Sequence, residues 1–172
     1  MGMFATGVAI IAVDHNDAVH AMTANAVSAL SLDPMQVLFC PSKRARLSAL
    51  LHHSVRFSIN FLREDEHTFS TYFAGGWKVG APPPFRFVSA EGVPRLEGCL
   101  ASISCSVRQI LEGGDHWLVI GEVMAIHHGI GPHRPLLFFK GKYEALSSSA
   151  SAPAPILDDV RDEPPRVFYH HE

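Results

Sequence analysis

Short apolar runs separated by turn-forming residues recur between residues 1 and 146. Runs of about four to eight apolar or alternating residues between such breaks are typical of β-strands. The runs at 8–13 and 19–22 flank DHNDA, whose Asn-Asp pair predicts a hairpin turn. Asp33 and Pro34 predict a second turn, ahead of a strand that ends at Cys40. We therefore expect a three-stranded antiparallel sheet at the beginning of the chain.

Two segments have the pattern of short helices. In RARLSALLHH, residues 44–53, the leucines recur on one helix face, and Ser42 precedes the segment as a candidate N-cap. EDEHTFSTYFAG, residues 64–75, carries acidic residues in its first turn and Gly75 near its end, which are start and stop signals of a helix.

The remaining patterns predict further strands. VRFSINFL, residues 55–62, alternates apolar and polar positions, which predicts a strand with one buried face. Residues 75–85 are rich in Gly and Pro and predict a surface loop. The apolar runs 99–111 and 116–128, joined by EGGD, predict a long hairpin, and 135–146 predicts another strand. About six or seven short strands with two brief helices favour an antiparallel, Greek-key-like barrel, a mainly β fold, over a parallel α/β sheet.

Composition and charge narrow the class of protein. Of 172 residues, 47% are hydrophobic and 18% are charged, which fits one globular domain at 1–146. Residues 147–172 are poor in core-forming residues and predict a flexible linker and tail. A net charge of −3 predicts neither nucleic-acid nor polybasic membrane binding. The first apolar run is too short to cross a bilayer and lacks a basic signal-peptide start, so we expect a cytoplasmic protein.

The metal-binding residue types have no metal-ligand spacing. The three cysteines fit buried free thiols, and the eleven histidines, three pairs among them, fit surface positions. We expect no metal site.

Two polar segments are candidates for ligand binding. In MTANAVSALSLDP, residues 22–34, hydroxyl and amide side chains alternate with small residues, which lets a planar heterocycle approach the backbone. A polar transition from strand to turn explains the same pattern. CPSKRAR, residues 40–46, combines basic side chains with the beginning of a predicted helix, where a phosphate is favoured; a solvated basic helix start is the alternative. A ring-binding edge beside a phosphate site is what FMN or FAD requires.

His116 is the third candidate. In EGGDHWLVIGEV, residues 112–123, the glycines and Asp115 are explained by a tight turn, but the turn does not require His116. A surface histidine beside a turn is the simplest interpretation from the pattern alone.

Five segments together resemble the flavin-reductase-like family, the FMN-binding split barrels that serve as small reductase components of two-component flavin monooxygenases. They occur in the family's order over residues 1 to 146, and they are FATGVAIIAV, MTANAVSALSLDP, FSINFL, GGDHWLVIGEV and PLLFFKGKY. The resemblance implies a split β-barrel with a few short helices that transfers hydride from NADH or NADPH to FMN or FAD. It also implies a homodimer and a partner flavin-dependent monooxygenase that receives the reduced flavin.

The resemblance assigns roles to individual residues. His116 matches the histidine of the family's GDH motif near the nicotinamide, where it positions the substrate instead of donating a proton. The residues that match flavin-binding positions are Met22, Thr23, Ala24, Asn25, Ala26, Ser28, Pro41, Ser42, Lys43, Arg46, Phe61, Leu62 and Tyr143.

The chain departs from the family pattern at three places. Ala26 and Leu47 stand where family members often have hydroxyl residues, and relatives usually carry a helical segment ahead of MGMFATGV. The two lost hydroxyls leave open a barrel that binds flavin without turnover, as a carrier or sensor. A related barrel acting on pyridoxine phosphate or haem is a further alternative, but its phosphate-clamping arginines and haem-ligating histidine have no clear counterparts here.

Overall fold

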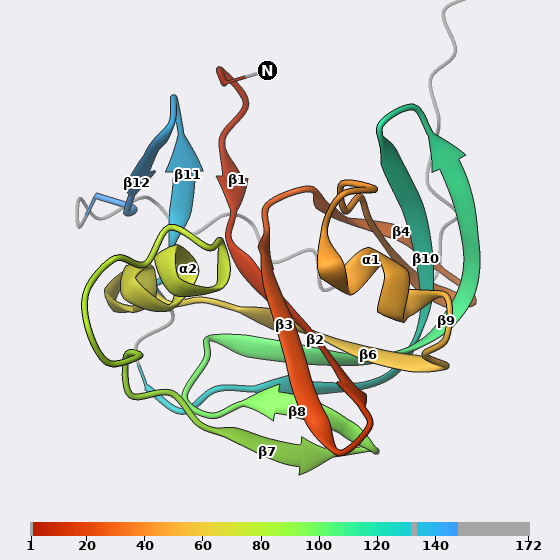
Figure 1. Cartoon of the computed structure of the whole chain (residues 1–172). Helices are drawn as coiled ribbons and strands as arrows, with labels where there is room; N and C mark the ends of the chain where they lie inside the picture. The colour runs from red at the N-terminus through yellow and green to blue at the C-terminus, as the bar shows by residue number, and fades with distance from the viewer. Residues whose placement is uncertain (1, 132–133, 148–172) are drawn as a thin grey trace, which may run out of the picture.

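The computed structural model describes residues 2–131 and 134–147, and all structural statements below concern these residues. They form an antiparallel β structure with short helices (Figure 1). The strands are β1 Thr6–Gly7, β2 Ala9–His15, β3 Ala18–Ala24, β4 Val27–Leu32, β5 Met35–Phe39, β6 Arg56–Phe61, β7 Phe87–Ala90, β8 Val93–Leu96, β9 Ala101–Gly113, β10 His116–His128, β11 Leu137–Phe139 and β12 Lys142–Glu144. The helices are α1 Arg46–Leu51, the 3₁₀ turn η1 Glu64–Glu66 and α2 His67–Phe73.

A seven-stranded sheet in the order β3-β2-β6-β9-β10-β5-β4 forms the body of the fold. Its two edge strands, β3 and β4, are consecutive in the chain but do not pair with each other, so the barrel is split between them. The inner face of the sheet buries the main core, which includes Phe39, Phe57 and Ile59, and α1 adds Leu47 and Leu51 to it. The antiparallel barrel expected from the strand pattern is therefore confirmed.

A second, smaller core lies on the other face of β2 and β6. It contains Ile10, Leu62, Leu96 and Leu136, and aromatic side chains from α2 and the segment that follows it pack against it. The β7–β8 hairpin and α2 cover this face (Figure 1). The sequence pattern did not predict β7 and β8, because four-residue strands on either side of a Glu-Gly turn, with Pro94 inside one of them, give too little alternation.

The predicted one-sided burial of β6 is wrong. Ser58 and Asn60 were expected to face solvent, yet both side chains are completely buried. The Ser58 hydroxyl donates to the carbonyl of Pro94, and the Asn60 amide donates to the carbonyl of Ile10. Because β6 lies inside the sheet and β8 covers its second face, satisfied polar groups are buried where the sequence pattern indicated exposure.

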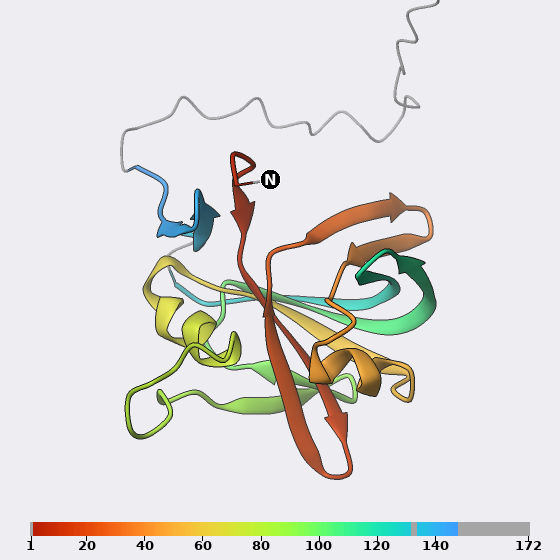
Figure 2. The same ribbon diagram turned by 45° about the horizontal axis from the view of Figure 1, so that its top comes forward.

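The expected three-stranded beginning is also wrong. The turns were predicted correctly: β2 and β3 form a hairpin around Asn16 and Asp17, and β4 and β5 form another around Asp33 and Pro34. The two hairpins do not adjoin, however, because β5 pairs with β10 at the opposite side of the sheet (Figure 2). Partner choice among strands depends on the closed shape of the sheet, which a local pattern does not encode.

Three further expectations need correction or lie outside the described residues. α1 begins at Arg46 after Ala45, so Ser42 is not its N-cap. The single strand expected at 135–146 is a hairpin of β11 and β12, turned at Lys140 and Gly141, which both have positive φ. The predicted tail lies outside the described residues from 148 onward.

In the described ranges no helix has the length and apolar character needed to cross a membrane.

Candidate functional site

A cavity of about 480 Å³ opens where β3 passes into β4. Asn25 and Ala26 connect the two strands, and the Ala26 carbonyl accepts a hydrogen bond from the backbone N–H of Cys40 at 3.0 Å. β1 and the β11–β12 hairpin stand on the other side of this connection (Figure 2). The lining residues are Gly2, Phe4, Thr6, Asn25, Ala26, Val27, Ser28, Leu38, Cys40, Phe138 and Lys140. A mostly apolar wall with a few polar groups is typical of a site for an aromatic heterocycle.

A smaller cavity of about 190 Å³ shares Asn25 and Phe138 with the large one. Thr23, Ser70 and Tyr143 line it and are connected by hydrogen bonds. The Thr23 hydroxyl donates to the Ser70 carbonyl at 2.6 Å, and the Tyr143 hydroxyl donates to Ser70 Oγ at 2.9 Å. The predicted site residues Thr23, Asn25 and Tyr143 thus come together from β3, the β3–β4 connection and β12.

The segment 41–43 lies directly against the beginning of β10. The backbone N–H of Trp117 donates to the carbonyl of Pro41, and the N–H of Lys43 donates to the carbonyl of Asp115, both at 2.9 Å. Ser42 and His116 form an isolated β-bridge between these two bonds. Two candidate segments that are far apart in the sequence therefore form one structure, which continues from Cys40 at the wall of the large cavity.

Lys43 is the cation of this structure. Its Nζ lies 3.3 Å from a carboxylate oxygen of Glu112 and 4.6 Å from the centre of the Trp117 ring. The ammonium group remains partly exposed, so its ion pair is worth little in stability and the group stays available to an anion.

His116 is held by its neighbour. Its Nδ1 lies 2.8 Å from the carboxylate of Asp115, and this hydrogen bond, together with the charge of the imidazole, lowers the pKa of Asp115. The imidazole is 44% exposed, so it can reach a ligand. Orientation by a carboxylate fixes which ring nitrogen faces outward, which suits a positioning group.

Several predicted residues lie elsewhere. Arg46 lines a separate cavity of about 420 Å³ with His15 and His20, near the tip of the β2–β3 hairpin. Leu62 is fully buried in the smaller core, and Phe61 is half-buried against the main core. Ala24, Ala26 and Ser28 line the cavities, whereas Met22 packs against the main core.

The sequence pattern missed part of the cavity wall. Leu38, Cys40, Phe138 and Lys140 are ordinary strand and turn residues by pattern, and only the pairing of β5 with β10 and of β11 with β1 brings them to the cavity. Ser70, on α2, was missed for the same reason. All three cysteines were predicted to be buried; Cys99 and Cys105 are, whereas Cys40 is only partly buried. Burial raises the pKa of the Cys99 and Cys105 thiols to about 11 and about 12. In the described residues, no three metal-ligating side chains of His, Cys, Asp or Glu cluster together.

Comparison with known protein families identifies the family of this chain. The flavin reductase like domain family matches residues 1–147. The chain belongs to this family. The resemblance inferred from five short segments is thereby confirmed over the whole described domain.

Known members of the family are similar along most of their length. The reductase subunit HsaB of a flavin-dependent monooxygenase from Rhodococcus jostii (strain RHA1) is 35% identical over 166 residues, covering 93% of this chain and 82% of HsaB. An NADH-dependent flavin reductase from a Rhodococcus species is 37% identical over 149 residues, covering 85% of this chain and 82% of that protein. The solved structure of the flavin reductase PheA2 in its native state has a TM-score of 0.79 and 40% identity, over 85% of this chain and 93% of PheA2.

Proposed function

We propose that this flavin-reductase-like protein uses NADH or NADPH to reduce FMN or FAD and releases the reduced flavin to a partner flavin-dependent monooxygenase. The observation that carries the proposal is the large cavity at the β3–β4 connection, bordered by Asn25 and Ser28 and continued by Cys40 into the 41–43 segment. The names of HsaB and of the Rhodococcus reductase support the same reaction.

The residues around the large cavity fit a flavin. A volume of about 480 Å³ lies within the range of about 300–1,000 Å³ usual for such ligands. Val27, Leu38 and Phe138 offer apolar surface to a fused ring, and Asn25 and Ser28 offer donors and acceptors to its polar edge. A small side chain at Ala26 leaves the backbone of the connection open to close approach, so the lost hydroxyl does not exclude flavin binding.

The protein's own groups bind and orient. Lys43, on the segment that continues from the cavity wall, is a charged donor for a flavin phosphate, as is Lys140 in the lining of the large cavity. His116, oriented by Asp115, positions the nicotinamide nucleotide. The flavin itself, when bound, supplies the two-electron chemistry. In such a reaction the chain has to bring two rings together in the correct orientation, and no strong acid or base is required of it.

One assay tests the reaction. NADH or NADPH is mixed with the full chain, FMN and FAD are added separately, and the loss of the reduced-nicotinamide absorbance is followed. We expect consumption that depends on both the enzyme and the flavin. A chain that binds flavin tightly but consumes neither nicotinamide would be a carrier or sensor, the alternative that Ala26 and Leu47 leave open, and would contradict the proposal.

We also propose a homodimer. Apolar side chains remain exposed along β4, β5 and β10, on the side of the molecule where the sheet ends. They are Leu30, Leu32, Met35, Met124 and Ile126. An exposed apolar edge strand needs a partner, and a second copy of the same chain supplies a matching edge.

We also propose that the protein is cytoplasmic. Its three cysteines are unpaired, which is consistent with a reducing compartment.

A further inference from the structure

A buried polar layer lies between the seven-stranded sheet and the β7–β8 hairpin, away from the flavin cavity. On β6, Ser58 and Asn60 are completely buried and bond to β8 through the Pro94 carbonyl and the Leu96 N–H. The next strand continues the layer with Ser102, which is paired with Asn60 across the sheet. The β6 half of the layer is therefore satisfied by the backbone of the hairpin.

The β9–β10 half of the layer is not satisfied. Ser102 and Ser104 are each 1% exposed, and neither hydroxyl has a hydrogen-bond partner among the described residues. Arg95 Nε, on β8, and His127 Nε2, on β10, are also buried without a hydrogen-bond partner among the described residues. Ser102 lies directly opposite His127 in the β9–β10 register, so the two side chains share one face of the sheet. Buried polar groups without partners are rare and call for a ligand or ordered water.

Three of the four residues that carry these groups, Arg95, Ser102 and His127, line one cavity of about 340 Å³. Its lining residues are Arg95, Leu96, Glu97, Gly98, Cys99, Ser102, His127, His128, Gly129 and Ile130. Ser104, the fourth group, is not among them. The two buried hydroxyl residues therefore differ in one respect: Ser102 lines the cavity and Ser104 does not.

We propose that this cavity binds a small oxyanion, a carboxylate or a phosphate group. Ser102 Oγ and Arg95 Nε are donors, and His127 Nε2 is a donor whenever the ring carries its proton there. A negatively charged oxygen is an acceptor that suits each of the three donors, and its charge complements the guanidinium of Arg95. Leu96 and Ile130 add apolar wall for a ligand with a carbon skeleton.

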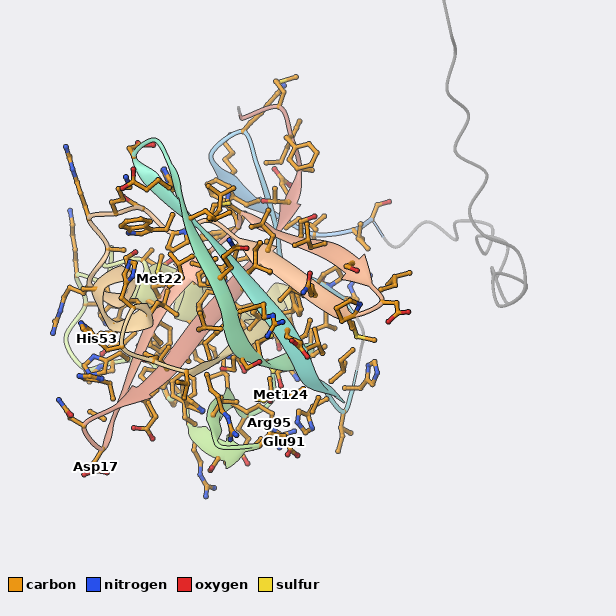
Figure 3. All side chains as sticks on the ribbon, turned by 90° about the vertical axis from the view of Figure 1, so that its right-hand side faces the viewer. Asp17, Met22, His53, Glu91, Arg95 and Met124 are labelled. Carbon is orange, nitrogen blue, oxygen red and sulfur yellow. The ribbon has the colours of Figure 1, made fainter. Side chains whose placement is uncertain are left out.

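The local charges permit this assignment. Glu97 is the acidic residue of the lining, and its carboxylate lies 3.7 Å from the guanidinium of Arg86, which is not a lining residue. Arg95 has no ion pair among the described residues. In the view of Figure 3, Arg95 is well separated from Met22, which precedes the flavin-site residues on β3. The proposed site is distinct from the flavin cavity, with which it shares no lining residue.

Thermal unfolding of the full chain tests the proposal without any flavin or nicotinamide. Sodium phosphate and sodium acetate are compared with sodium chloride at equal ionic strength and pH. We expect at least one of the two oxyanions to raise the Tm of the parent chain in a saturable way, and the arm that does so identifies the group as phosphate or carboxylate. Ser102→Ala and Arg95→Met should weaken the apparent affinity about tenfold or more.

Two control variants make the outcome decisive. Ser104→Ala removes an equally buried, unpartnered hydroxyl that does not line the cavity, and this variant should keep the full shift in Tm. Lys43→Met should also keep the shift in Tm, and that result would exclude phosphate binding at the proposed flavin site as its cause. Equal shifts in the Ser102→Ala and parent chains, or no shift with either oxyanion, would overturn the proposal. The Ser102→Ala variant should fold like the parent chain, because the hydroxyl that it removes has no hydrogen-bond partner among the described residues. The result of the unfolding experiment does not depend on the reductase assay, so the two proposals can fail separately.

Discussion

At the residue scale, His116 illustrates how one side chain acquires a role from its neighbours. Asp115 orients its imidazole, and the bridge to Ser42 holds it beside Lys43. His116→Ala is expected to raise the KM for NADH or NADPH roughly tenfold while the Kd for flavin changes little, because one hydrogen bond to the nicotinamide nucleotide is lost. Steady-state kinetics and flavin titration measure the two effects. His53→Ala, an exposed histidine after α1, serves as control, and a larger effect on flavin affinity than on the KM would refute the role.

Lys43 is expected to contribute to the binding of flavin. Lys43→Met keeps an apolar side chain of similar length but removes the ammonium group that lies over the Trp117 ring, so we expect flavin to bind about tenfold or more weakly. Fluorescence titration with FMN and with FAD gives the two Kd values. Arg44→Met, at the exposed neighbouring position, should leave them within about twofold. Unchanged flavin binding in Lys43→Met would remove this residue from the site.

Glu66 makes a pH-dependent contribution to stability. Burial raises the pKa of its carboxyl above the ordinary 4.5, although the carboxylate accepts a hydrogen bond from the N–H of Arg63 at 2.7 Å. The native state keeps this proton to a higher pH than the unfolded chain does, so the contribution to the free energy of unfolding falls as the pH rises above 4.5.

Glu66→Gln tests this dependence because the amide oxygen still accepts from Arg63. The variant should gain Tm relative to the parent as the pH is raised from about 4 to about 7, since it has no charge to bury. Scanning calorimetry at both pH values measures the difference. Glu144→Gln, at an exposed position on β12, should show no such change. A constant difference between Glu66→Gln and the parent would contradict the assignment.

At the scale of elements, Gly121 on β10 leaves the room that the side chains of Phe57 on β6 and Cys105 on β9 occupy in the core. A Cβ at this position would lie 2.5 Å from Cζ of Phe57 and 3.2 Å from Cβ of Cys105, and both side chains are completely buried. Gly121→Ala should therefore lower the free energy of unfolding by about 1–3 kcal/mol. Denaturant unfolding measures it against Gly80→Ala in the loop after α2, where a Cβ meets no atom within 4 Å. Equal stability of the two variants would show that the core can accommodate the methyl group.

The elements differ in how well the sequence predicted them. The hairpins at Asn16–Asp17, Asp33–Pro34 and Gly114–Asp115 were predicted because turn chemistry is local. The burial of β6 was not, because Ser58 and Asn60 are polar by type and become buried only when β8 supplies their partners. The candidate site shows the same division between local and long-range information. Thr23, Asn25 and Lys43 were predicted from residue type, whereas Leu38 and Phe138 reach the large cavity only through strand pairing.

At the scale of the whole molecule, the split barrel leaves an apolar edge that a second copy of the chain should cover. Leu32, on β4, is 83% exposed, so Leu32→Glu should leave the monomer folded but weaken the dimer at least tenfold by burying an unpaired carboxylate. Analytical ultracentrifugation over a range of concentrations measures the dissociation constant. Val79→Glu, at a position 69% exposed on the loop after α2, is the matched control. A monomeric parent chain, or a dimer unaffected by Leu32→Glu, would contradict this interface.

The sequence by itself determined the antiparallel β class, the principal turns, the family and the polar segments around Thr23, Lys43 and His116, because each depends on residue type and short-range order. Only the tertiary structure decided which hairpins adjoin one another, that β4–β5 closes the sheet against β10, and that segments 41–43 and 115–117 form one structure. It also decided that Arg46 and Leu62 lie away from the proposed flavin cavity and that Ser102, Arg95 and His127 line another cavity. Long-range pairing follows from burying all apolar faces at once, and that requirement belongs to the whole chain.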